Sequence, residues 1–367
     1  MTTTPSPARA ARRPGRRPAL VGLIVGLLFG LPWWTLVAAP GWPVAVVVAG
    51  SVAVLAAAVA MPVLMVFGHG SRQRDAAART GDVLLGVTWV LFAWSALGLV
   101  ASLVVGARIA AVAVLAVALV LVACGVVEAR RVPRVREREV RVAGLGADLD
   151  GLRVAVLTDT HFGPIDRSRW SARVVEVVNR LRPDVVVHVG DLADGSVARR
   201  HAQVDPLGDV RAPRGRYYIV GNHEHYGGAA QWVEHMRGLG WQPLVNEHRP
   251  IGEGLVLAGI DDPTGAPDLA AALAGADPTW PVLLLAHQPI QVAAASAAGV
   301  ALQISGHTHG GQIWPFHFLV RTSQPVLAGL SRHGGTQLYV SRGTGFWGPP
   351  LRIFAPSEIS VLTLRRP

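Results

Sequence analysis

Long stretches without a charged side chain constrain this sequence more than any other feature. No Asp, Glu, Lys or Arg occurs in residues 19–67, 83–107 or 109–127. About 18 to 20 apolar residues are enough for a helix to cross the hydrocarbon core of a bilayer. The first stretch is long enough for two crossings, with a break at Pro40-Gly41-Trp42. We therefore predict four transmembrane helices, at about 19–39, 43–67, 83–107 and 109–127.

The arginines predict the orientation of these helices. The tail 1–18 is basic and has no acid, and further arginines cluster between the second and third helices and after the fourth. Cytoplasmic loops are enriched in Lys and Arg, so we expect the N-terminus and everything after the fourth helix in the cytoplasm. A cleavable signal peptide ending near Ala38-Ala39 is the alternative for the first helix. Three further helices would still anchor that product.

The net charge of +10 does not indicate a nucleic-acid-binding protein. Residues 1–141 carry 15 Arg against 5 acids, whereas residues 142–367 carry 19 of each sign. The arginines are better explained by topology and by contact with anionic membrane lipids. The single cysteine, Cys124, lies inside the fourth apolar stretch, which excludes disulfides and thiolate metal sites from the rest of the chain. No nucleic acid is expected as a partner, and no protein partner is predicted.

The part of the chain after the last apolar stretch has the pattern of a layered α/β domain. Residues 129–150 form a charged, then Gly- and Asp-rich linker, in which Pro133 discourages an unbroken helix. From residue 151 to 367, short apolar runs alternate with amphipathic stretches. We predict strands at 153–158, 184–189, 216–220, 254–260, 281–286, 301–305, 337–341 and 358–364, and helices at 166–181, 229–239 and 267–275.

Polar residues of the types that bind metals follow five of the predicted strands. Each apolar run stops directly on such residues, so that their side chains can project into one crevice. In chain order the five groups are Asp159 and His161, Gly190-Asp191, Gly221-Asn222-His223-Glu224, His287, and Gly306-His307-Thr308-His309. The donors are oxygen and nitrogen only, which suits Mn, Fe, Zn, Co or Ni and disfavours soft metals.

The series D-x-H, G-D, G-N-H-[DE], H and G-H-x-H, in this order, resembles the calcineurin-like metallophosphoesterase superfamily. All five blocks are present without a substitution, and the resemblance covers about residues 150–365. The flanking sequences resemble the membrane-associated bacterial branch: Leu149 to Arg153, Gly310-Gly311-Gln312, Ser341 to Gly345, and Pro349 to Arg352 with Glu358. The resemblance implies a four-layer α-β-β-α sandwich, here preceded by four transmembrane helices. That branch has a single leader or anchor, so its localisation is not transferred to this chain.

The resemblance also implies two divalent metal ions and their ligands. Asp159, His161, Asp191 and His309 would hold one ion, and Asp191, Asn222, His287 and His307 would hold the second. Asp191 would bridge them, since a carboxylate suits two dications about 3.5 to 4 Å apart. A metal-bridging hydroxide would attack phosphorus in line, without a covalent intermediate on the enzyme. His223 would stabilise the transition state or protonate the leaving oxygen.

Several residues near these groups have less specific predictions. His188 is expected in the core or behind a ligand, and Asp194 either orients a ligand or has a loop or capping role. Glu224 and the adjacent His225 are expected at the rim of the site and not among its ligands. Two further candidates, Arg342 and Trp347, are predicted to line the substrate cleft, with packing as the alternative for the tryptophan.

These features predict a multi-pass, membrane-anchored phosphoric ester hydrolase with a dinuclear metal centre and a catalytic domain, residues 151–367, in the cytoplasm. Anchoring by four helices favours a substrate at the bilayer surface: a phosphodiester or pyrophosphate of a lipid or lipid-linked sugar nucleotide. General phosphodiesterase activity fits the resemblance equally well. Two alternatives stay open. One is a catalytically silent membrane sensor or scaffold with the same fold, and the other is the same enzyme facing the cell envelope.

Overall fold

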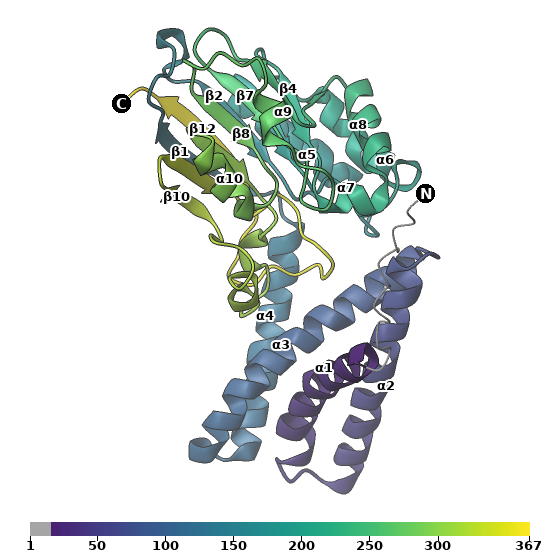
Figure 1. Ribbon diagram of the computed structural model, residues 1–367. Coiled ribbons are helices and arrows are strands. Elements are labelled where there is room, and N and C mark those ends of the chain that lie inside the picture. The colour runs from purple at the N-terminus through teal and green to yellow at the C-terminus, as the bar shows by residue number, and fades with distance from the viewer. Residues whose placement is uncertain (1–15) are drawn as a thin grey trace, which may run out of the picture. The chain divides into compact units, whose positions relative to one another are not determined.

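The computed structural model describes residues 16–367, and internal contacts divide the chain into two units (Figure 1). The first unit comprises Val87–Leu119 and the chain up to Val63, and the second comprises Leu64–Gly86 and Val120–Pro367. All the sheets belong to the second unit. Most of the predicted basic tail, residues 1–15, lies outside the described part of the chain.

Four helical segments precede the sheets. They are α1 (Arg16–Trp33), which continues into a π-helical turn at Trp34–Ala38, α2 (Val44–His69), α3 (Asp75–Val105) and α4 (Ala107–Arg130). Among the described helices, α2, α3 and α4 are long and apolar enough to cross a membrane. The first segment contains a shorter apolar helical stretch, Gly22–Ala38. The structure therefore supports three of the four predicted spans, and the first stays a prediction.

The helices extend beyond the uncharged runs from which they were predicted. α3 begins at Asp75, where a carboxylate in the first turn stabilises the helix N-terminus, and α4 ends at Arg130, where a cation stabilises the C-terminus. A criterion based only on the absence of charge excludes these terminal turns. Asp75 and Arg130 both belong to the second unit.

Two six-stranded sheets form the rest of the second unit. Their strand orders are β1-β12-β2-β3-β4-β5 and β10-β11-β9-β8-β7-β6. The strands are β1 (Arg134–Arg141), β2 (Arg153–Leu157), β3 (Val185–Val189), β4 (Arg216–Ile219), β5 (Gln242–Pro243), β6 (Glu247–Pro250), β7 (Val256–Gly259), β8 (Val282–Leu285), β9 (Leu302–Ser305), β10 (Gly329–His333), β11 (Thr336–Val340) and β12 (Glu358–Arg365). All eight predicted strands form, and the sequence did not predict β1, β5, β6 or β10.

Short helices connect these strands. They are α5 (Ser168–Leu181), α6 (Val197–Val204), α7 (Asn222–Gly227), α8 (Ala229–Gly238), α9 (Leu269–Leu273), α10 (Val292–Ala297) and α11 (His317–Val320). Val156 of β2 and Leu285 of β8 belong to one apolar core shared by both sheets. A second core joins the first sheet to α5 and α8 through residues such as Trp232, and a third joins β7 and β8 to Ala272 of α9 and Ala295 of α10.

The segment predicted as a linker contains a strand. β1 pairs in parallel with β12 along its whole length and so forms the edge of the first sheet. Val140 is 1% exposed and belongs to the core between the sheets, whereas most of the Arg and Glu side chains of β1 are exposed. Charged side chains on an edge strand discourage pairing with other chains. The sheet therefore begins before residue 151, where the sequence placed the start of the domain.

Parallel pairing brings the predicted site residues to one edge. β2, β3 and β4 are parallel neighbours in the first sheet, as are β7, β8 and β9 in the second. Their interior residues are buried on both faces, which explains the continuous apolar runs in the sequence. The carboxyl ends of parallel strands point the same way, so the loops after β2, β3, β4, β8 and β9 come together.

Candidate metal site

Six polar residues in these loops form two clusters of donor atoms, and the buried Asn222 begins α7 in the loop after β4. The six are Asp159, His161, Asp191, His287, His307 and His309. Five of them, Asp159, His161, Asp191, His307 and His309, have positive φ values of 53°, 44°, 53°, 68° and 52°. Residues with a side chain adopt this left-handed conformation rarely, at a cost of about 1 to 3 kcal/mol each. The surrounding fold therefore holds these residues in strained positions, a pattern that is common at functional sites.

Asp159, His161 and His309 form the first cluster of donor atoms. Each offers one atom, and all three atoms lie within 4.8 Å of one another. His161 Nε2 lies 3.0 Å from His309 Nε2, and Asp159 Oδ1 lies 3.4 Å from the same atom of His309. All three side chains are buried. Their nitrogen and carboxylate atoms thus converge on one point, as the ligands of a metal ion do.

Asp191, His287 and His307 form the second cluster. His287 donates from Nδ1 to the carbonyl oxygen of Val189 at 2.8 Å, which directs its Nε2 toward Asp191 Oδ2, 3.2 Å away. A backbone carbonyl on one ring nitrogen commonly fixes a histidine whose other nitrogen binds a metal. Asp191 Oδ2 is also 3.6 Å from His161 Nε2 of the first cluster. This oxygen therefore stands between the two clusters.

The hydrogen bonding of two buried polar atoms indicates whether the residues at this site suit metal ions. Within the described part of the chain, Oδ1 of Asn222 and Nε2 of His287 form no hydrogen bond, although Asp191 Oδ2 lies 3.2 Å from the histidine nitrogen. Nearly all buried polar atoms in proteins are hydrogen-bonded, so two exceptions at one site indicate an additional ligand. The donors are carboxylate, amide and imidazole groups, which suit borderline and hard divalent cations. The residues at this site therefore fit two divalent metal ions.

Asp194 connects the first cluster to His223. Its Oδ1 lies 2.9 Å from His161 Nδ1 and 2.7 Å from His223 Nδ1. The Nε2 atom of His223 lies 4.0 Å from Asp191 Oδ2, and its backbone N–H donates to the other oxygen of Asp191 at 3.0 Å. A carboxylate behind a histidine fixes its ring orientation and its protonation. Asp194 thus sets the orientation of His161 and His223 together.

Glu224 is not at the rim, where the sequence placed it. It is fully buried, and its two carboxylate oxygens accept hydrogen bonds from the backbone N–H groups of Asp191, Leu192, Ala193 and Gly221, at 2.7 to 3.2 Å. The side chain therefore ties the loop after β3 to the loop after β4. The acid of the G-N-H-[DE] block was the available signal, but the sequence does not reveal that its partners are backbone amides.

Two buried arginines support the same loops, and the sequence analysis assigned a role to neither. Arg167 donates to the carbonyl oxygens of Thr160 and His161, and its guanidinium stacks on Phe346 at 4.4 Å. Arg352 donates to the carbonyl oxygens of His309 and Gly345, among others. Burial lowers the pKa of each arginine to about 10, so both remain charged at neutral pH.

The remaining candidates lie around these clusters. His188 is fully buried in β3 and lies 3.1 Å from the hydroxyl of Thr160, behind the site. The ring of Trp347, which is 48% exposed, lies 5.9 Å from that of His223. Arg342 lies beside Gly310, the residue after His309, with its Nη1 3.9 Å from Glu358 Oε2. Trp347 thus lies next to the proposed acid, and Arg342 next to the first cluster.

Burial and nearby carboxylates shift the pKa values of the histidines at this site in opposite directions. Burial lowers the pKa of His223, but the charges of Asp191 and Asp194 outweigh burial and raise the pKa to about 9. The same balance, with Asp191 as the main partner, raises the pKa of His287 to about 10. Burial lowers the pKa of His307 to about 4 and that of His188 to about 3. The charges of Asp191 and Asp194 therefore favour the protonated form of the His223 imidazole.

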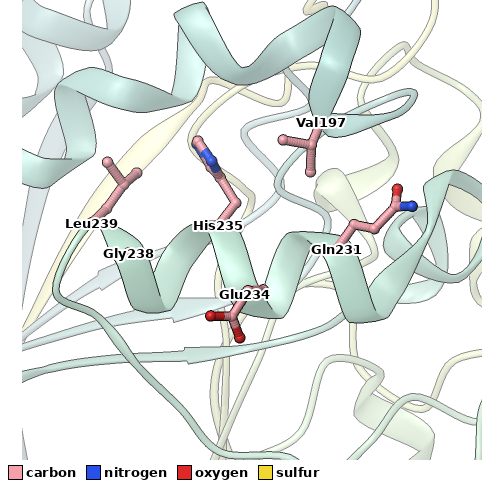
Figure 2. A pocket seen from close by; sticks show the side chains of 6 residues that line it. All are labelled: Val197, Gln231, Glu234, His235, Gly238 and Leu239. Atoms are coloured by element: carbon pink, nitrogen blue, oxygen red, sulfur yellow. The ribbon is translucent and has the colours of Figure 1, made fainter.

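A hollow on the surface lies elsewhere in the second unit. Figure 2 shows it between α6 and α8, lined by Val197, Gln231, Glu234, His235, Gly238 and Leu239. None of the predicted site residues lines it. The histidine of this lining, His235, has its Nε2 3.0 Å from Asp205 Oδ1. This hollow therefore has no part in the site.

Known proteins share the sequence of this part of the chain. Residues 152–311 match the family described as calcineurin-like phosphoesterase. An uncharacterized metallophosphoesterase of Bacillus subtilis is 32% identical over 228 residues, which is 59% of this chain and 80% of that protein. This chain belongs to the calcineurin-like metallophosphoesterases. The family description names a phosphoesterase, and the name of the Bacillus subtilis relative adds that it is a metallophosphoesterase.

Some relatives of this metallophosphoesterase are named as transmembrane proteins. A "Transmembrane protein with metallophosphoesterase domain" of Danio rerio is 38% identical over 266 residues, or 67% of this chain and 61% of that protein. The chain therefore spans less than two thirds of that relative. A bacterial branch is too narrow a description, because the relatives include animal proteins. A solved dimetal phosphatase of Danio rerio has a TM-score of 0.38 and 12% identity, covering 59% of this chain and 93% of that one, which is too distant to add to the assignment.

Proposed function

We propose that this metallophosphoesterase is a membrane-anchored hydrolase with two divalent metal ions, acting on a phosphodiester or pyrophosphate at the bilayer surface. The position of Asp191 carries the proposal. Its Oδ2 lies 3.2 Å from His287 Nε2 and 3.6 Å from His161 Nε2, between the two clusters. One carboxylate so placed can be shared by two cations that act on one phosphate.

The ligand assignment follows the two clusters. Asp159, His161, Asp191 and His309 would hold one cation, and Asp191, Asn222, His287 and His307 would hold the other. When bound, the cations supply charge stabilisation to the phosphoryl oxygens and lower the pKa of a water molecule. Membership of this chain in the metallophosphoesterase family supports a pair of ions. A donor set of oxygen and nitrogen atoms suits Mn, Fe, Zn, Co and Ni alike.

His223 is the proposed proton donor. Its ring is held by Asp194 at 2.7 Å, and its Nε2 faces Asp191 Oδ2 at 4.0 Å. A protonated imidazole in this position can donate to the leaving oxygen of the substrate or to a phosphoryl oxygen. We also propose that Trp347 and Arg342 line the substrate cleft, because both lie next to the clusters and both are partly exposed.

The finer descriptions of the fold and topology belong to the same proposal. We infer four layers, α-β-β-α, because separate apolar cores join each sheet to helices. We infer a multi-pass protein with its catalytic part, from β1 onward, in the cytoplasm, because arginines cluster at Arg130, Arg131 and beyond. A reporter fused after Pro367 tests this topology. Activity of a reporter that folds only outside the cytoplasm would favour the envelope-facing alternative.

Hydrolysis by the purified full chain tests the activity. The substrates are bis-p-nitrophenyl phosphate and p-nitrophenyl phosphate, with the metal-free protein and with added Mn²⁺. We expect metal-restored turnover, a loss of about 100- to 10,000-fold in His223→Ala with both metals retained, and loss of metal as well as activity in Asp191→Asn. His201→Ala, an exposed histidine away from the site, is the control and should match the wild type.

The ratio of diester to monoester hydrolysis then narrows the substrate class. Two metals bound to a wild-type protein without turnover on any phosphoester would favour the silent sensor or scaffold instead. Turnover that survives in His223→Ala would remove this residue from the mechanism and leave the metal sites in place.

A further inference from the structure

Exposed apolar side chains gather on one part of the second unit outside the long helices. Phe318 and Leu319 of α11 are 61% and 52% exposed, and Phe354 is 69% exposed. Phe354 also has a φ of 60°, although a bulky residue rarely adopts a left-handed conformation. The chain therefore accepts backbone strain at Phe354 while leaving its ring outside the core. Such strain is common where a side chain is needed for function.

These residues are held together by the backbone. Ile313 forms bridges with Ile353 and Phe354, the N–H of Trp314 donates to the carbonyl oxygen of Ile353 at 3.2 Å, and the rings of Trp314 and Phe354 lie 6.5 Å apart. α11 follows three residues after Trp314. Phe318, Leu319 and Phe354 thus lie on neighbouring segments, and we call these three exposed residues the apolar patch.

The segment that carries Phe354 contacts the C-terminal end of α4. The N–H of Arg352 donates to the carbonyl oxygen of Gly125 at 3.0 Å, and a Cβ atom on Gly125 would lie 3.0 Å from Ile353 Cγ1. Figure 1 shows the yellow-green loops that follow β9 beside this end of α4. Gly125 lies five residues before Arg130, or about 7.5 Å along the helix axis. The segment therefore reaches past the charged end of α4 to its uncharged part.

The same segment, 349–353, also packs closely against α3. A Cβ atom on Gly86 would lie 2.7 Å from Leu351 Cδ1 and 2.8 Å from Pro349 Cβ. Gly86 lies inside the uncharged run of α3 that follows Asp82. A larger residue at Gly86 would collide with the segment, so glycine permits this close approach. Two membrane-spanning helices thus contact the segment 349–353 at uncharged positions.

We infer that the apolar patch inserts into the phospholipid leaflet on the side of the second unit. A side chain at the level of Gly86 and Gly125 lies where the spans themselves face lipid, and exposed aromatic and leucine residues are the types that insert at the headgroup boundary. Arg321, directly after α11, is exposed and can contact anionic headgroups. Phe318, Leu319 and Phe354 then lie in the acyl region of the interface.

The inserted patch is connected to the rim of the metal site. Gln312 donates from Nε2 to the carbonyl oxygen of Trp347 at 2.7 Å and accepts from the N–H of Trp347 at 2.9 Å. Trp347 lies 5.9 Å, ring to ring, from His223. This consequence rests on the proposed function: a phosphoester headgroup at the leaflet surface lies beside the metal site without leaving the membrane.

Fluorescence quenching in the full chain tests the insertion. In a Cys124→Ser background, which removes the only cysteine, Phe318→Cys, Phe354→Cys and Ala270→Cys are labelled separately with a polarity-sensitive dye. The proteins are reconstituted in vesicles of phosphatidylcholine and phosphatidylglycerol. Ala270 lies on α9, at the end of the sandwich away from α4 (Figure 1), and is the matched exposed control.

Nitroxide groups on the upper acyl chain should reduce the emission of the labels at 318 and 354 by about half or more and leave the label at 270 unchanged. Aqueous iodide should quench only the label at 270. Iodide quenching of all three labels would overturn the inference. Labels at 318 and 354 shielded from both quenchers would also overturn it and indicate a protein on the patch. The readout does not require turnover, so failure of the proposed activity would leave it unaffected.

Discussion

One carboxylate oxygen of Asp194 contacts two histidines. Its Oδ1 contacts Nδ1 of His161, a proposed ligand, and Nδ1 of His223, the proposed acid. Away from the site, Asp205 also contacts two histidines, but through different oxygens: Oδ2 lies 3.1 Å from His201 and Oδ1 lies 3.0 Å from His235. Asp205 therefore provides a control for Asp194, because each aspartate contacts two histidines and only Asp194 lies at the site.

Replacing Asp194 should therefore impair metal binding and catalysis together. Removal of a carboxylate behind a metal-binding histidine typically costs about 10- to 100-fold in affinity or activity. We expect Asp194→Asn to need more Mn²⁺ for half-maximal activity and to turn over more slowly even at saturating Mn²⁺. Titration of activity with metal measures both effects. Asp205→Asn should change neither, and equal effects of the two variants would refute the role of Asp194.

Glu224 should matter for stability even though it binds no metal in our assignment. In Glu224→Gln, one carboxylate oxygen becomes an NH₂ group that faces two backbone N–H groups. Each unsatisfied donor costs about 1 to 3 kcal/mol. The melting temperature of the variant should fall clearly below that of the wild type. Glu234→Gln, at an exposed position of α8 paired with Arg237, should shift stability by less than about 0.5 kcal/mol and is the control.

The sequence identified residues that end strands but not residues that support loops. The proposed ligands were accessible because each directly follows an apolar run. Glu224, Arg167 and Arg352 were not, since their partners are backbone groups distant in sequence, such as the carbonyl of His309 for Arg352. A local pattern carries no information about such contacts. Their roles became visible only when the loops were placed together.

Among the elements, β1 shows how an exposed, charged strand can hide a buried position. Its sequence Arg-Val-Arg-Glu-Arg-Glu-Val-Arg reads as a linker because charges alternate with few apolar residues. Only the pairing with β12 reveals that Val140 faces the core while Val135 is 36% exposed. The short strands β5, β6 and β10 escaped prediction for a similar reason, because they are at sheet edges or contain few buried residues.

A charge introduced into β1 should therefore act according to position. Val140→Asp places an unpaired carboxylate in the core between the sheets, and we expect a loss of about 3 kcal/mol or more in unfolding free energy. Val135→Asp is the matched substitution on the same strand and should have little effect. Thermal unfolding of the detergent-solubilised chain measures both. Similar melting temperatures would contradict the assignment of β1 to the sheet.

At the scale of the whole molecule, the metal ions should stabilise the fold. The site gathers the buried carboxylates of Asp159 and Asp191, the half-buried carboxylate of Asp194, and several strained loop residues. Only the folded chain presents them together. A ligand at 100 times its dissociation constant stabilises a protein by about 2.7 kcal/mol if the unfolded chain does not bind it. We expect chelation to lower the melting temperature and Mn²⁺ to restore it.

Asp191→Asn provides the control for that experiment, because it removes the shared ligand. Its melting temperature should respond less to chelation than that of the wild type. A wild-type protein that melts at the same temperature with and without chelator would contradict a structural contribution of the metals. The measurement is independent of the substrate and therefore separates metal binding from turnover.

The positions of the long helices could be predicted from the sequence, whereas the order of the strands within the two sheets could not. Apolar runs predicted helices α2, α3 and α4, because a span needs only length and the absence of charge. Strand order was not predictable, since β12 lies between β1 and β2 although it ends the chain. Nothing local in the sequence specifies which strands far apart become neighbours.

The pairing of β1 with β12 also bears on how the protein is made. Roughly 220 residues separate the two strands, and a ribosome adds about 5 to 20 residues per second. β1 leaves the ribosome directly after a membrane helix and then waits tens of seconds for its neighbour. During that interval β1 has no partner strand in the first sheet. A nascent chain interrupted before Glu358 therefore lacks β12, the strand that joins β1 to β2, and its first sheet stays divided.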